Sequence, residues 1–118
     1  MIITTPISVG ELLDKITILQ IKSQYSNNSY IHKELTDLTN IAKEHQVYNE
    51  QDLQALKEVN SKLWEIEDEL RELEKQQDFS NTFIELARQV YKTNDERARI
   101  KKQINEKTNS TYSEVKLY

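Results

Sequence analysis

Apolar side chains recur at helical spacing through residues 81–107, but polar side chains interrupt the same face. A helix that turns ~100° per residue places a broad arc of mostly apolar residues on one side: Phe83, Leu86, Ala87, Val90, Tyr91, Ala98, Ile100 and Ile104. Four polar residues fall within that arc: Asn94, Arg97, Lys101 and Asn105. A helix that only fills a core does not need them, so the pattern predicts a long helix with a local polar patch.

An earlier helix begins near the N-terminus. Ser8 and Glu11 have the spacing of a capping box, and Ile7 and Leu12 have that of a hydrophobic staple, which predicts a helix over Val9 to about Gln24. Its inner arc consists of Leu12, Leu13, Ile16 and Leu19, and its other side carries Ile18 and Ile21. Because both faces contain apolar side chains, we expect this helix to be covered from two directions.

Two more helices are predicted in the middle of the chain. The turn formers Ser26–Ser29 precede a helix with Ile31, Leu35, Leu38 and Ala42 at helical spacing. Asn49 is suited to cap a third helix, over about Glu50–Gln76. Its apolar residues alternate three and four apart, as in coiled coils: Leu56, Val59, Leu63, Ile66, Leu70 and Leu73. A turn then returns the chain into residues 81–107, with Ser80 or Asn81 as the cap, which predicts an antiparallel hairpin.

Both ends of the chain are predicted to be extended. Met1–Thr5 is rich in β-branched residues and precedes Pro6, and Thr111–Tyr118 alternates in a strand-like way. We expect this C-terminal tail to pack back on the helices, alongside the N-terminal arm. The fold prediction is one all-α domain over residues 1–118: an antiparallel bundle of about four helices, with the first two packed on the long hairpin. The coiled-coil-like seam also favours a homodimer.

Composition narrows the function classes. The 118-residue chain has a formal net charge of −4, whereas general binders of nucleic acid or anionic membranes are basic. It contains no cysteine, which excludes disulfides, thiolate metal sites and a Cys nucleophile. Its one glycine, Gly10, is too few for phosphate-cradling loops. It has no apolar run of ~20 residues and no signal-peptide layout, so we expect a cytoplasmic protein with no membrane contact and no cofactor.

The polar patch of residues 81–107 is the main candidate for a functional site. In one interpretation the patch is purely structural, because Arg97 and Lys101 can form ion pairs with Glu11 and Asp14 of the first helix. The aliphatic parts of the two side chains can also pack on apolar surface while the charged ends reach water. Alternatively, the cations and amides present donors to an anionic or sugar-like ligand, or to a partner protein. The candidate ligand-binding residues are Asn94, Arg97, Lys101, Asn105, Glu11, Asp14, Lys15 and Tyr91.

Other groups of polar residues give weaker indications of a functional site. Glu11 and Asp14 could act as acid and base, but acids at a helix start are common for capping, and we assign no catalytic residue. His32 and His45 lack the spacing of metal ligands, so no metal site is expected. The basic run at 97–102 follows two acids in an acidic chain, which makes nucleic-acid binding a minor alternative.

Three segments occur in a familiar order: ISVGELLDKITILQIK at 7–22, NDERARIKKQIN at 94–105 and EVKLY at 114–118. On these segments the chain resembles a bacterial and phage family of short helical proteins classed as a domain of unknown function. The resemblance implies that the first helix, the last helix and the tail form one unit, with the middle helices as scaffold. It implies no activity.

Two function classes remain open. The first is a non-catalytic helical binding or assembly module, which is favoured because no catalytic arrangement stands out. The second is a binding protein or an enzyme that takes a small anionic or sugar-like ligand through Asn94, Arg97, Lys101 and Asn105, facing the first helix.

Overall fold

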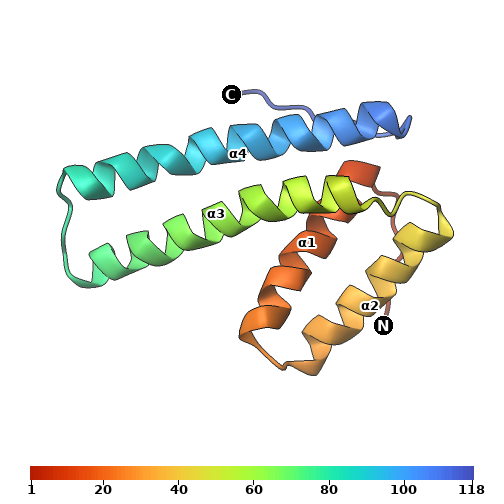
Figure 1. Cartoon of the computed structure of the whole chain (residues 1–118), viewed down its shortest axis with the longest axis horizontal. Coiled ribbons are helices and arrows are strands. Elements are labelled where there is room, and N and C mark those ends of the chain that lie inside the picture. Colours follow the sequence, from red (N-terminus) through yellow and green to blue (C-terminus); the bar gives the residue numbers. More distant parts are fainter.

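The computed structural model describes residues 1–118 and consists of four α-helices without a strand. They are α1 (Val9–Tyr25), α2 (Ser29–Glu44), α3 (Glu50–Lys75) and α4 (Asn81–Lys107). α3 and α4 form a long antiparallel hairpin, and α1 and α2 form a shorter one set at a steep angle to it (Figure 1). The predicted all-α bundle with its long hairpin is therefore confirmed.

Local capping explains where the helices begin. The Ser8 hydroxyl accepts the Glu11 N–H at 3.1 Å at the start of α1. The side chains of Asn28 and Asn49 likewise accept a first-turn N–H of α2 and α3, each at 2.9 Å. Ser80 occupies the N-cap position of α4, as predicted, but its side chain makes no capping hydrogen bond. Three of the four starts thus have the side-chain acceptor that such positions favour.

α1 lies at the centre of the core. It packs against α2, α3 and α4, and its Leu13 and Ile16 are fully buried, so it is covered from more than one direction, as expected. α2 makes its close backbone contacts with α1 alone. Its Ala42 nevertheless belongs to the same buried cluster as Leu53 and Leu56 of α3, so α2 joins the hairpin mainly through α1 and through this shared core. The main apolar cluster comprises Leu12, Leu13, Ile16, Ala42, Leu53, Leu56 and Ile104.

The long hairpin is unevenly covered along its length. Its proximal half, α3 residues 50–62 with α4 residues 93–107, receives α1 and contains the buried Leu56, Val59 and Ile104. Its distal half, α3 residues 63–75 with α4 residues 81–92, extends for the most part beyond α1 (Figure 1). α1 reaches it at Trp64, whose ring stacks on that of Tyr25 with centroids 5.3 Å apart. Each half contains part of the predicted α3 seam, so the difference arises from α1 and not from the seam itself.

In the distal half, Ile66 is the one buried apolar side chain. At its tip, Phe79 and Phe83 pack edge to face, with ring centroids 5.2 Å apart. Phe79 and Ile84 remain half exposed. The distal half is therefore a two-helix structure whose apolar side chains are only partly removed from water.

The two ends of the chain lie on different sides of the molecule (Figure 1). Residues 111–118 return along α4, where Lys116 pairs with Asp95 at 3.2 Å. The N-terminal arm, residues 1–7, is exposed and leaves on the side of α2. The tail thus packs back on a helix, as expected, but the prediction that it runs alongside the arm is wrong. None of the four helices combines the length and apolar character needed to cross a bilayer.

Candidate functional site

The first turn of α1 touches the last turns of α4. The Gly10 N–H donates to Asn105 Oδ1 at 2.7 Å, and the Val9 N–H donates to Ser110 Oγ at 3.2 Å. A Cβ at Gly10 would lie 2.7 Å from the Lys101 carbonyl oxygen, inside any tolerable contact distance. The lone glycine of the chain therefore permits this close approach. Asn105 of α4 and Ser110 just after it satisfy two N–H groups that a helix start leaves unpaired.

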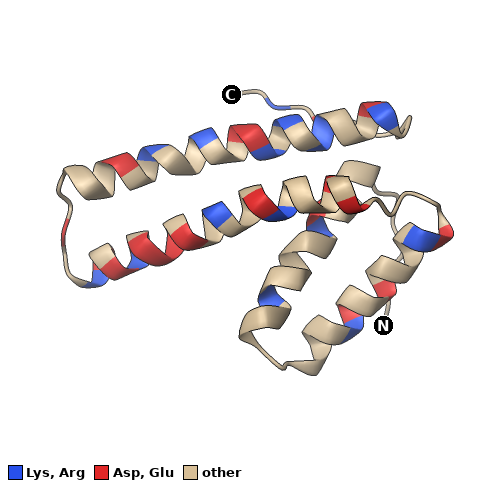
Figure 2. Cartoon of the chain, viewed as in Figure 1, with Lys and Arg blue, Asp and Glu red and all other residues tan.

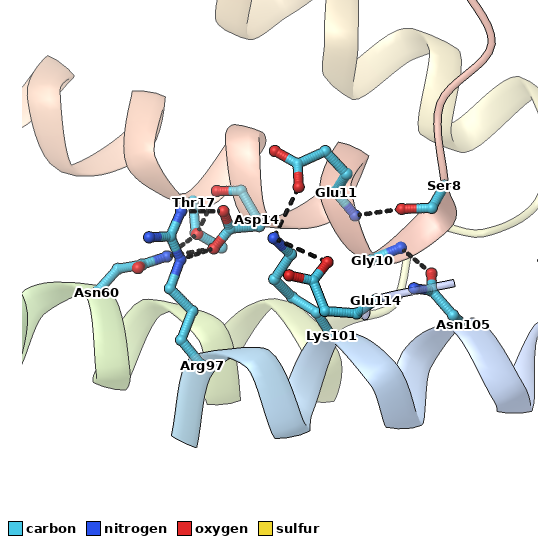
Figure 3. Close-up of polar contacts among 10 residues, drawn as sticks. All are labelled: Ser8, Gly10, Glu11, Asp14, Thr17, Asn60, Arg97, Lys101, Asn105 and Glu114. Carbon is cyan, nitrogen blue, oxygen red and sulfur yellow. Dashed lines mark hydrogen bonds and ion pairs between the residues drawn. The ribbon is translucent and has the colours of Figure 1, made fainter. Parts of the chain in front are cut away.

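Asp14 is the most buried charge of the molecule, with 1% of its surface exposed. The Arg97 guanidinium donates to both of its carboxylate oxygens, at 3.0 Å from Nε to Oδ1. Asn60 Nδ2 adds a hydrogen bond to Oδ1 at 2.8 Å and another to Thr17 Oγ1 at 2.9 Å. These side chains converge from α1, α3 and α4 (Figure 3), so the buried carboxylate is neutralised and hydrogen-bonded.

Lys101 holds a second set of charges one turn further along α4. Its Nζ lies 2.7 Å from Glu11 Oε2 and 3.3 Å from Glu114 Oε2, and its side chain is 8% exposed. Glu11 therefore reaches across to α4. The predicted reverse half of the capping box, in which Glu11 would turn back to the start of its own helix, does not form. Glu114 ties the C-terminal tail to the same lysine (Figure 3).

The pKa values of both cations are raised by this surrounding. The hydrogen bond to Asp14 raises the pKa of Arg97. Partial burial lowers this pKa, but the nearby carboxylates raise it further, and the net shift is upward. Burial alone would lower the pKa of Lys101, but Glu11, Asp14 and Glu114 together outweigh it and raise that pKa. Both side chains therefore stay charged at neutral pH, and each already faces a carboxylate.

Of the eight candidate residues, five come together at the α1–α4 crossing: Glu11, Asp14, Arg97, Lys101 and Asn105. Lys15 lies elsewhere, half exposed and 3.3 Å from Glu34 of α2. Tyr91 is 54% exposed, and with Asn94 it lines a groove between α4 and the tail. Whether any of them binds a ligand stays a prediction.

This tail groove has a volume of about 780 Å³. Its walls include Tyr91, Asn94, Arg97 and Lys101 from α4, and residues 114–118 form the other side. Inside the adjoining α1–α4 crossing, the Asn105 Nδ2 group is buried without a hydrogen-bond partner. In this groove, several candidate residues face open space together.

A second groove, of about 590 Å³, lies between α3 and α4, and no residue of α1 lines it. The buried Thr93 contributes a hydroxyl without a partner. Its rim carries charges of both signs, and several pair with one another, such as Lys107 with Asp52 at 2.7 Å. Because charges of both signs alternate around the rim, this groove suggests no substrate class.

Three polar contributors were missed from the sequence: Asn60, Thr17 and Glu114. Asn60 did carry a signal, because it follows Leu53 and Leu56 at the spacing of one helical stripe and is therefore polar where an apolar residue is expected. Thr17 and Glu114 carried none, since their roles depend on where α3 and the tail pass. No group of His, Asp or Glu side chains in the molecule is arranged to hold a metal ion.

The fold and the site together define an all-α protein whose first and last helices are joined by internally paired charges. The family model described as a family of unknown function, DUF6165, matches residues 3–118, and the chain belongs to this family. The resemblance to an uncharacterised family is thus confirmed. No curated protein and no solved structure matches the chain.

Proposed function

We propose that this protein is a non-catalytic assembly module that binds another protein chain, with a homodimer as the expected form. One contrast carries the proposal. The charged candidate residues at the α1–α4 crossing are paired within the chain, whereas large apolar side chains of the distal hairpin are exposed to water.

The paired charges argue against a catalytic role for the crossing. Arg97 and Lys101 already donate to Asp14, Glu11 and Glu114. A substrate anion would have to replace one of these carboxylates, and breaking a buried pair costs about 3–5 kcal/mol. These ion pairs are suited to holding α1 against α4. None of their carboxylates or cations is left unpaired to act as a catalytic acid or base.

The exposed apolar residues argue for a protein partner. Phe79, Ile84 and Tyr91 are each 50–54% exposed, and large apolar side chains exposed to water often mark a protein interface where they gather on one face. Lys and Arg are interspersed with acids along α3 and α4 (Figure 2). A surface of mixed charge around apolar positions is typical of helices that bind other helices.

The ligand-binding alternative rests on the tail groove. Its volume, about 780 Å³, falls within the usual range for small-molecule sites. Asn94 and Tyr91 line it without belonging to the buried pairs. In this alternative, an anionic or sugar-like molecule replaces the Glu114 carboxylate beside Lys101.

Light scattering over a range of concentrations separates the two functions. Assembly predicts a mass that rises toward twice the 14.0 kDa of the chain. The ligand alternative is tested by thermal shift with carboxylates, phosphates and nucleotide sugars, because a bound ligand raises the melting temperature. A monomeric mass at every concentration, together with a thermal shift that Asn94→Ala abolishes, would overturn the assembly proposal in favour of ligand binding.

A further inference from the structure

α4 carries two heptad seams side by side. The inner seam consists of Phe83, Leu86, Val90, Thr93, Arg97, Ile100 and Ile104. Of these, Thr93, Ile100 and Ile104 line the groove between α3 and α4, whereas Val90 and Arg97 line the tail groove. One position further round the helix, the same three-four spacing recurs. This outer seam consists of Ile84, Ala87, Tyr91, Asn94 and Ala98. A seam with this spacing is the geometry by which a helix packs against another helix.

The outer seam has no helix packed along it in the single chain. α1 meets α4 at the proximal end of this seam and beyond it, at Arg97, Lys101 and Asn105. The C-terminal tail shares the groove lined by Tyr91, Asn94 and Ala98. Ile84 stays 53% exposed and Tyr91 54% exposed, so even with the tail in place the seam keeps large apolar surface in contact with water.

We propose that the outer seam is the contact between two copies of this chain, which pair α4 against α4 in antiparallel orientation. This inference rests on the assembly function proposed above and adds its surface, partner and register. In an antiparallel pair, Ala87 lies opposite Ala98 of the second copy. Tyr91 lies opposite Asn94 of the second copy, so the phenol and the amide can hydrogen-bond. The small alanines allow the two backbones to approach closely.

Charge complementarity selects this orientation and register. On the flank of the seam, Arg88 comes opposite Asp95 of the second copy, and the two-fold symmetry makes this ion pair twice. In the single chain, Arg88 has only a 3.4 Å contact with Glu85 of its own helix. A parallel pair would instead set Asp95 beside the apolar Val90. The antiparallel pair satisfies both flanking charges.

The C-terminal tail must leave the outer seam for this contact to form. Two ion pairs hold the tail on α4. Lys116 pairs with Asp95 at 3.2 Å, and Glu114 pairs with Lys101 at 3.3 Å. Val115 and Leu117 are 76% and 89% exposed, so the tail buries little apolar surface on α4. When it lifts, Lys101 keeps Glu11, and Arg88 of the second copy takes the place of Lys116 beside Asp95. The Lys116–Asp95 pair is partly exposed, and exposed ion pairs contribute little to stability. The Glu114–Lys101 pair is the more buried of the two and is therefore the main attachment of the tail.

The absence of cysteine from the chain makes a register test direct. Ala87→Cys and Ala98→Cys variants are prepared separately, mixed and oxidised. A disulfide needs Cα atoms about 4.4–6.8 Å apart. The mixture is expected to give a covalent dimer. Each variant alone should stay uncrosslinked, because in this register residue 87 lies 11 positions from its own copy, roughly 16 Å along the helix.

Charge exchange provides a second test by a different route. Arg88→Asp should weaken dimerisation at least about tenfold, and the Arg88→Asp/Asp95→Arg double variant should restore it, as two exchanged ion pairs allow. Glu114→Gln, which loosens the tail, should strengthen dimerisation severalfold. Sedimentation equilibrium measures all three.

The outcomes separate this inference from the proposed function. A dimeric mass without the mixed crosslink, or without rescue by the double variant, overturns the α4 pairing and leaves assembly standing. Crosslinking in each single variant would indicate parallel pairing and would also overturn it. A monomeric mass at every concentration overturns both.

Discussion

The two halves of the long hairpin use the same kind of sequence to different effect. In the proximal half, α1 lies across α3 and α4, and Leu56 and Ile104 are almost completely buried. In the distal half, the same three-four repeat continues, yet only Ile66 is buried. A coiled-coil-like seam therefore supplies the pairing of two helices, but a third helix is needed to remove their apolar residues from water.

The proximal half also contains nearly all the long-range polar contacts. Asp14, Asn60 and Arg97 connect three helices there, whereas ion pairs in the distal half join neighbours on one helix, such as Glu85 with Arg88. Stability should therefore be concentrated at the proximal end. Four predictions test this division, from the largest expected effect to the smallest.

Asp14→Ala should be the most damaging single change, lowering the free energy of unfolding by about 3–5 kcal/mol. It leaves Arg97 without its buried partner and Asn60 with one fewer acceptor. Urea denaturation measures the loss. The matched control is Asp68→Ala, an exposed acid of the distal half, with an expected effect within about 0.5 kcal/mol. Equal losses in the two variants would contradict the division.

Leucine truncation compares the two halves of one seam. Leu56→Ala removes a fully buried side chain and should cost about 2–5 kcal/mol. Leu70→Ala removes a partly exposed one and should cost only about 1 kcal/mol, because less apolar area is lost from the interior. Denaturation at low protein concentration provides both values. Similar costs would show that the distal half is as well packed as the proximal half.

Gly10→Ala should destabilise the protein by about 1–3 kcal/mol through overpacking. The new methyl group would meet the Lys101 carbonyl at 2.7 Å and Asn105 Oδ1 at 2.9 Å. The sign of the change in stability is informative, because replacing Gly by Ala within an uncrowded helix stabilises the helix by about 0.5–1 kcal/mol. Thermal unfolding of the variant is the measurement, and a raised melting temperature would exclude the close contact of α1 with α4.

The smallest effect concerns alkaline pH. Since the carboxylates around Lys101 raise its pKa in the folded state, its contribution to stability is complete below the unfolded pKa of about 10.4. That contribution is lost as the pH rises through the higher folded value. The stability difference between wild type and Lys101→Met should therefore shrink in strongly alkaline buffer. A difference that grows with pH would show that the lysine is not held by acids.

The sequence predicted the helices well because their signals are local. Val9 as the first residue of α1, the Asn49 cap and the α3 repeat depend on neighbours within a turn or two. Pairing of Arg97 and Lys101 with Glu11 and Asp14 was among the predicted alternatives, because these residues belong to helices that share apolar faces. Local chemistry alone was enough for these features.

What the sequence did not predict depends on how the helices cross. Glu11 has the spacing to fold back on its own helix start, but a lysine 90 positions later binds it instead. The contribution of Asn60 and the path of the tail along α4 follow from the angle at which α1 meets the hairpin. That angle is set by contacts distributed over three helices, and no single segment encodes it.

The hydrogen bond between the Val9 amide and Ser110 Oγ, at 3.2 Å, makes the helical body almost a closed ring. A short linker from residue 110 to residue 8 would complete it, with new chain ends opened at the turn after α3. Such a circular permutant, which omits residues 1–7 and 111–118, should fold, since permutation succeeds where the joined ends lie close together. The order in which the four helices leave the ribosome would then be free to change while the arrangement they reach stays the same.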